Sequence, residues 1–174
     1  ADTGPYEIRP ANYRDRLKLV DGTFQTIRGE VRSGAHVVIE SQLDPVKSYL
    51  DGDVFTNAVL MAPRTSAPYT GTRWELRLND TGAWSLFNQG YEERLLDGGG
   101  GVLKLGKGGG NADGPLDRVS EWLVFRDFVG FRFRPVGVES GWLSHIDGKA
   151  AILRRGMPIG LFCYWNVYPH LQSG

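Results

Sequence analysis

The sequence has few of the features that would narrow its function at once. It contains a single cysteine, Cys163, so the chain cannot form an internal disulfide. That residue lies in the apolar run GLFCYWNVY, which is typical of a small buried side chain rather than a nucleophile. No apolar run approaches the roughly 20 residues that a membrane-spanning helix needs. We therefore expect no disulfide framework and no membrane insertion.

The chain also lacks an excess of either charge. Its 20 basic and 20 acidic residues cancel, and the basic ones are scattered, so we expect no nucleic-acid partner. The histidines His36, His145 and His170 have no metal-ligand spacing, so we expect neither a metal nor a cofactor. His145 and Asp147 have a spacing that suits a surface hydrogen bond better than an acid–base pair. No carboxylates form a catalytic pattern, and we expect no enzymatic activity.

Helical periodicity is nearly absent, whereas short apolar segments separated by glycine, aspartate, asparagine and proline recur along the chain. Three segments, 36–52, 83–98 and 130–148, have the same order: a strand, a polar loop, and a second strand ending in an aliphatic-Asp-Gly sequence. A third short strand and a fourth strand with a tryptophan follow each of them. In this register the first strands start 47 residues apart at Val37, Trp84 and Phe131, and the tryptophans are Trp74, Trp122 and Trp165.

Three repeats of four strands predict an all-β fold, the β-trefoil, because propellers typically need four or more blades. Two strands of each repeat would form a six-stranded barrel, and the other two a hairpin across one end. We expect a single domain, 1–174, with repeats at about 36–80, 82–128 and 129–169. Residues 1–35 are left as an N-terminal extension, predicted to form a hairpin against the barrel unless the first repeat is assigned in the wrong register.

The three Asp-Gly pairs are predicted to form tight hairpin turns. Glycine readily takes the positive φ angles that a type I′ turn requires, and aspartate is favoured before it. The pairs begin at Asp51, Asp97 and Asp147. Local turn chemistry alone would favour aspartate at all three places.

The segment 101–108, GVLKLGKG, resembles a phosphate-binding loop, but Gly108 stands where a magnesium-binding serine or threonine belongs. The residues that follow do not begin a helix, whose N-terminus such a loop needs. We therefore interpret the segment as a turn and a returning strand of the second repeat.

An aliphatic-Asp sequence followed about 20 residues later by a strand with tryptophan resembles the ricin-B-type lectin module. The resemblance covers about residues 36–169 and implies a β-trefoil in which this aspartate accepts hydrogen bonds from sugar hydroxyls. It makes Asp51, Asp97 and Asp147 candidate sugar-binding residues. The Gln-x-Trp motif of that family is replaced by TRW, SEW and CYW. Near these aspartates, Tyr69 would supply a ring in the first repeat, and Asn111 a polar contact in the second.

The favoured function is thus a carbohydrate-binding, lectin-like module without catalytic activity. The alternative is a protein-binding trefoil that acts through its loops, such as a protease inhibitor, with Arg64 in the loop 62–71 as a basic anchor. The partners are then glycans or another protein. The start of the chain, ADTG without a methionine, favours a secreted protein over a cytoplasmic one.

Overall fold

In the computed structural model, the regular secondary structure of the described residues consists of strands and one short helical turn. Among the described residues, no helix is long and apolar enough to cross a membrane. The helical segment η2 (Leu161–Cys163) is a single 3-10 turn. For residues 23–26, 29–32, 97, 153 and 154 the structure describes the backbone only. The described residues are 23–26, 29–43, 47–63, 71–79, 82–88, 93–97, 102–107, 120–136, 141–154 and 160–170.

Twelve of the strands follow one another in three sets of four. The first set is β3 (His36–Ser41), β4 (Tyr49–Asp53), β5 (Ala58–Ala62) and β6 (Trp74–Leu78). The second set is β7 (Trp84–Asn88), β8 (Arg94–Asp97), β9 (Leu103–Gly106) and β10 (Trp122–Arg126). The third set is β11 (Phe131–Pro135), β12 (Gly141–Ile146), β13 (Lys149–Arg154) and β14 (Trp165–Pro169).

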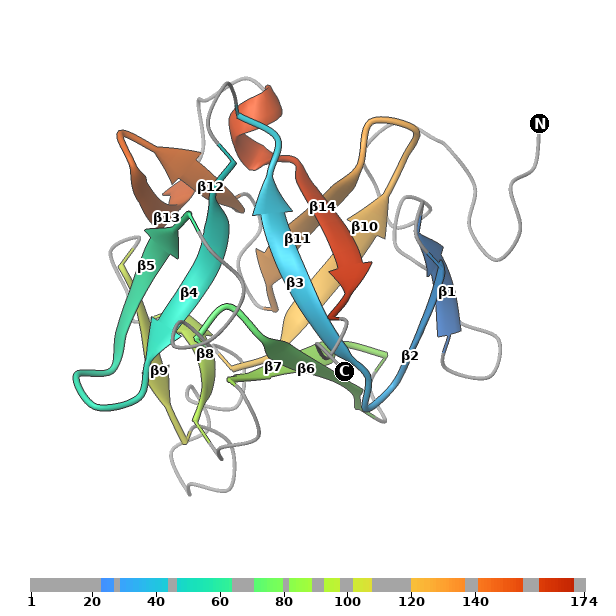
Figure 1. The fold of residues 1–174 in the computed structure, drawn as a ribbon, viewed down its shortest axis with the longest axis horizontal. Coiled ribbons are helices and arrows are strands. Elements are labelled where there is room, and N and C mark those ends of the chain that lie inside the picture. Colours follow the sequence, from blue (N-terminus) through green and yellow to red (C-terminus); the bar gives the residue numbers. More distant parts are fainter. Residues whose placement is uncertain are drawn as a thin grey trace.

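The first and fourth strands of each set close into a six-stranded barrel. Its strands pair antiparallel in the ring β3, β6, β7, β10, β11, β14 and back to β3. The second and third strands form the hairpins β4–β5, β8–β9 and β12–β13. Figure 1 shows these hairpins on the left of the molecule and the β10–β11 turn on the right. This arrangement confirms the predicted β-trefoil.

Three tryptophans repeat one core arrangement. As predicted, each lies in the fourth strand of its set. Each opens that strand and pairs with the start of the first strand: Val37 with Trp74, Trp84 with Trp122, and Phe131 with Trp165. All three are fully buried. Each indole N–H donates a hydrogen bond of 2.9–3.0 Å to the carbonyl oxygen of a second-strand leucine, so all three buried indole donors are paired. These marker leucines are Leu50, Leu95 and Leu143.

The three hairpins end in different turns, and only one matches its prediction. Asp147 and Gly148 have φ angles of 51° and 75° and join Ile146 to Lys149 as a two-residue turn, as expected. The prediction for Asp51 is wrong, because this residue lies within β4, paired with Leu60.

The real turn of the first hairpin comes later, at residues 54–57. The Oδ1 atom of Asp53 accepts hydrogen bonds from the backbone N–H groups of Phe55 and Thr56, at 2.9 and 3.4 Å. Asn57 then takes the positive φ, 63°. A side chain that caps two backbone donors makes this longer turn stable without an Asp-Gly pair.

The tight turn predicted at Asp97 is wrong too. Asp97 ends β8 and pairs with Leu103, so residues 98–102 all lie between the two strands. The strand that returns, β9, occupies the segment that resembles a phosphate-binding loop, as the turn-and-strand interpretation predicted.

An N-terminal hairpin precedes the barrel, as predicted. It consists of β1 (Thr23–Thr26) and β2 (Gly29–Arg32), and both strands contact β14. Figure 1 shows it on the right, at the end of the barrel away from the three other hairpins. Residues 1–22 of this predicted extension lie outside the described residues.

Candidate functional site

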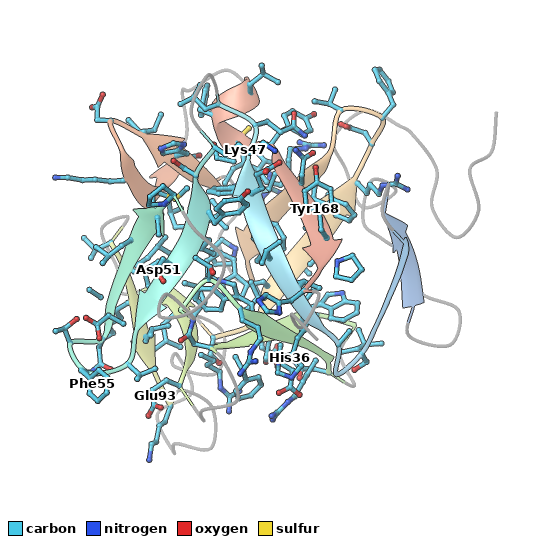
Figure 2. All side chains as sticks on the ribbon, viewed as in Figure 1. His36, Lys47, Asp51, Phe55, Glu93 and Tyr168 are labelled. Carbon is cyan, nitrogen blue, oxygen red and sulfur yellow. The ribbon has the colours of Figure 1, made fainter. Side chains whose placement is uncertain are left out.

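Asp51 is the sequence-predicted site residue that the structure describes most fully. It lies in the middle of β4, where burial alternates: Leu50 and Gly52 are buried, and Asp51 is only partly buried. Because successive side chains of a strand point to opposite faces, Asp51 lies on the face of the hairpin away from the barrel core. Figure 2 shows Asp51 midway along the hairpin, with Phe55 at its end.

This outer face combines a carboxylate with apolar side chains. Leu60 lies directly across from Asp51 and is 47% exposed, and Tyr49, two residues before Asp51, lies on the same face opposite Ala62. Ala58 is paired with Asp53 on this face. The two alanines are short, so Leu60 stands above its surroundings. We name the five residues Tyr49, Asp51, Leu60, Ala58 and Ala62 the outer face of the first hairpin.

The backbone at Gly71 packs directly against Asp51. A Cβ atom at Gly71 would collide with the Oδ1 atom of Asp51 and with the carbonyl oxygen of Gly52. The carbonyl oxygen of Gly71 accepts hydrogen bonds from the N–H of Gly52, at 2.9 Å, and from the buried amide Nδ2 of Asn88, at 2.8 Å. Asn88 belongs to β7, so the second repeat helps to hold the site of the first.

Two predicted site residues precede Gly71 in the chain. Tyr69 and Arg64 lie outside the described residues. Gly71, two residues after Tyr69 in the sequence, packs against Asp51. A contact between Tyr69 and Asp51 stays a prediction.

The environment of Asp51 disfavours its charged form. Burial raises the pKa of this carboxyl above the ordinary aspartate value, and the nearby carboxylate of Asp53 raises it further, while a backbone hydrogen bond from Gly52 opposes both. The described groups that shift this pKa include no lysine or arginine. A carboxylate held in this way is typical of a functional site.

The three candidate aspartates are not equivalent in the three repeats. Counted from the marker leucines, Asp51 follows by one residue, Asp97 by two and Asp147 by four. Leu96 and Ser144 stand where Asp51 stands, so the second and third repeats have no carboxylate at this strand position. The spacing measured from the Asp-Gly pairs was therefore misleading, because the three hairpins differ in length.

The structure does not bring the other predicted site residues together with Asp51. Asp147 is exposed at the tip of β12–β13. His145 is buried instead, and its Nδ1 atom lies 2.7 Å from the hydroxyl oxygen of Ser41, so His145 and Asp147 do not form the predicted surface hydrogen bond. Of Asp97 only the backbone is described, and Asn111 lies outside the described residues.

Sequence reasoning missed Tyr49 and Leu60. Both belong to the outer face of the first hairpin, and the signal for Tyr49 was present, because residues two apart in a strand share a face. The misplaced turn hid it. With Asp51 assigned to a turn, neither Tyr49 nor the cross-strand partner Leu60 had a defined direction.

Cys163 and the histidines supply no further site of the usual kinds. Cys163 is fully buried, as predicted, and burial raises the pKa of its thiol, which keeps it protonated and unreactive. Within the described stretches, no three histidine, cysteine, aspartate or glutamate side chains gather as metal ligands would.

Comparisons with known proteins identify the fold. No protein-family model matches this sequence, and no curated protein matches it either. Solved structures do match. One is an endo-β-galactosidase from Clostridium perfringens that releases GlcNAcα1-4Gal, with a TM-score of 0.65 and 15% identity over 79% of this chain. The chain spans about a third of that enzyme, 33% of its length.

Two other matching structures are covered over almost their whole length. SeviL, solved with an asialo-GM1 saccharide, has a TM-score of 0.60 and 10% identity, covering 79% of this chain and 99% of its own. The designed three-fold symmetric protein ThreeFoil has a TM-score of 0.58 and 12% identity, covering 78% and 99%. At such low identities the likeness establishes the shared β-trefoil fold, and function has to be argued from the site.

Proposed function

We propose that this protein is a carbohydrate-binding module whose site is the outer face of the first hairpin. The observation that carries the proposal is the placement of Asp51, a partly buried carboxylate held against Gly71 with the exposed side chain of Leu60 opposite. The chain maintains this carboxylate although burial and Asp53 both disfavour its charge. A ligand that donates hydrogen bonds to it would compensate that cost.

A sugar ring has the chemistry that this face requires. Two hydroxyl groups of one ring can donate hydrogen bonds to the two oxygens of Asp51, and such charge-assisted bonds are stronger than neutral ones. The ring's C–H face is apolar and would pack on Leu60 and the ring of Tyr49, both on the same side of the hairpin. The alanines on either side of Leu60 leave room for a flat ligand.

We further propose that binding proceeds without catalysis. Glycoside hydrolysis normally needs two carboxyl groups, one as acid and one as base or nucleophile. Asp53 is the second carboxylate on this strand face, but its Oδ1 atom caps the 54–57 turn and is committed to the backbone. Its role is therefore structural.

The related structures support a binding role. SeviL was solved with a saccharide bound. The C. perfringens endo-β-galactosidase acts on a glycan, and the part of that enzyme that matches this chain is 33% of its length. Our proposal assigns this trefoil the task of holding a glycan, alone or beside other parts of a longer protein. An extracellular location, where glycans are displayed, belongs to the same proposal.

A glycan array tests it with a matched pair of variants. Asp51→Asn and Asp147→Asn make the same chemical change, one on the outer face of the first hairpin and one in the exposed turn of the third. We expect Asp51→Asn to lose binding and Asp147→Asn to keep the parent's pattern. Equal binding by the parent and Asp51→Asn would refute the site, and no binding to any glycan would refute the function.

Protein binding is the second candidate, favoured by the turn between β10 and β11. Phe128 in this turn is 82% exposed, yet the turn is held by hydrogen bonds: Asp127 accepts a hydrogen bond from the N–H of Val129 at 2.8 Å, and Gln42 donates one to the carbonyl oxygen of Val129 at 2.7 Å. An exposed ring on a rigid support is typical of an interface anchor. Inhibition of trypsin-like proteases that is lost in Arg64→Ala would favour the inhibitor alternative, which uses a different loop.

A further inference from the structure

Two arginines of the third repeat share one aromatic ring. Arg132 and Arg134 lie on the outer side of β11, since Phe131 and Phe133 face the core. Their guanidinium carbons lie 4.4 and 4.0 Å from the ring centre of Trp142 in β12. Two like charges are thus held side by side on a single indole, far in the sequence from Asp51.

Only one of the two arginines has a carboxylate. The Nη2 atom of Arg132 lies 3.7 Å from the Oδ2 atom of Asp127. That carboxylate is already heavily used: it accepts hydrogen bonds from the hydroxyl of Tyr164, at 2.6 Å, and from the backbone N–H groups of Val129 and Gly130. It neutralises at most one of the two guanidinium groups.

Among the described residues, Arg134 makes no hydrogen bond and no ion pair. Its Nε atom is shielded from water without a partner, and its contacts are the rings of Trp142 and Phe125. Stacking on a ring satisfies the face of a guanidinium but leaves its N–H donors, which lie in the plane, unused. Burial and the neighbouring charge of Arg132 both lower the pKa of Arg134, so the two adjacent positive charges are unfavourable here.

We propose that Arg134, supported by Arg132, binds an oxyanion such as a sulfate or carboxylate group. A guanidinium offers paired N–H donors whose geometry matches two oxygens of such a group. The bound charge would pair the unused donors of Arg134 and offset the repulsion from Arg132. The source of the oxyanion is an acidic saccharide, which makes this a second site that selects sulfated or uronate-containing glycans. That part rests on the proposed function, whereas binding of the oxyanion itself does not.

The site carries its own spectroscopic reporter. The chain has five tryptophans, and the four others are at most 1% exposed in the core. Trp142 is the partly exposed one, directly under both guanidinium groups. An anion that binds Arg134 changes the field and the water around this indole, so its emission will respond.

The test is a fluorescence titration of the full chain with sodium sulfate and, separately, sodium acetate, against sodium chloride at the same ionic strength. We expect a saturable change with the oxyanions and none with chloride. Arg134→Gln should weaken the response at least about tenfold, the loss of one charge-assisted bidentate contact. Arg134→Lys keeps the positive charge but loses the paired N–H donors of the guanidinium, so its affinity for the oxyanion should lie between those of the parent and Arg134→Gln.

The matched control is Arg77→Gln. Arg77 also stacks on a ring, 3.9 Å from the centre of Phe87, but it is paired with Glu75 at 2.7 Å. This variant should respond to oxyanions like the parent. No saturable response in the parent, or an unchanged response in both Arg134 variants, would overturn the proposal.

Acidic and neutral glycans then distinguish the two sources of the oxyanion. Preference for sulfated or uronate glycans that disappears in Arg134→Gln supports the saccharide. A response to free sulfate without any such preference overturns the saccharide source and leaves a free oxyanion as the ligand. Asp51→Asn should keep the sulfate response whatever becomes of its glycan binding, so failure of the proposed function and failure of this inference are told apart.

Discussion

At the scale of a single residue, Asp51 lies in an environment that disfavours its charged form. Its carboxylate is partly buried, close to that of Asp53, and packed against the backbone of Gly71. Neither burial nor a like charge favours an ionised group. Residues that break local rules in this way tend to mark functional sites, where binding compensates what folding loses.

This placement predicts a stability difference that depends on pH. The pKa of Asp51 is raised in the folded protein, so folding is favoured while the group is protonated and loses this contribution as pH rises through the raised value. Asp51→Asn removes the ionised form. We expect the variant to be more stable than the parent at pH 7, with the gain vanishing as pH falls below the unfolded aspartate value of about 4.

Denaturant unfolding at several pH values measures the effect. Asp147→Asn is the control, because Asp147 is exposed and asparagine also suits its turn. A stability gain for Asp51→Asn that is equally large at pH 7 and at low pH would contradict the explanation.

At the level of elements, Gly148 and Gly71 are required for different physical reasons. Gly148 needs its positive φ in the turn of β12–β13, and a side chain there would meet nothing within 4 Å. At Gly71 the need is space, because a Cβ would collide with Asp51 and Gly52. The first glycine maintains a turn, and the second lets a loop end close against the outer face of the first hairpin.

Alanine substitutions separate the two roles. We expect Gly148→Ala to cost roughly 1–2 kcal/mol of unfolding free energy, the cost of a left-handed conformation, and to leave glycan binding unchanged. Gly71→Ala should displace Asp51 and abolish glycan binding. Calorimetry together with the glycan array checks both, and retained binding by Gly71→Ala would show that the position of Asp51 does not depend on this contact.

Over the whole molecule, contacts between repeats hold the barrel and its hairpins in register. The hydrogen bond between Ser41 of β3 and His145 of β12 joins the first repeat to the third, and that from Asn88 to Gly71 joins the second to the first. The Oγ atom of Ser41 also accepts the N–H of Leu43, so its own proton is available for the Nδ1 atom of a neutral His145. The link thus favours an uncharged imidazole.

The contribution of the histidines to stability should accordingly decrease on mild acidification, opposite in sign to that of Asp51. Burial lowers the pKa of His145 below its ordinary value of 6.5, and the pKa of His36 is lowered too. The unfolded chain therefore takes up protons before the folded one, and the unfolding free energy falls as pH drops below about 6.5. His145→Gln should flatten part of this decline, and an equally steep decline in the variant would assign it elsewhere.

The repeat, and with it the β-trefoil fold, could be predicted from the amino-acid sequence. Val37, Trp84 and Phe131, with a tryptophan near the end of each repeat, recur because three equivalent core positions need large apolar side chains. Such a periodic requirement is legible along the chain. The buried cysteine and the Asp147-Gly148 turn could be predicted for a similar reason, since each depends on its immediate neighbours.

Long-range packing, by contrast, places Asp51 on a strand face and brings its neighbours against it. Whether an Asp-Gly pair turns or continues a strand depends on where the partner strand ends: β5 pairs with β4 through Asp53, so Asp51 stays in the strand. Gly71, Asn88 and the arginines on Trp142 come together across loops and repeats. No spacing records such contacts, because they arise only when the chain closes on itself.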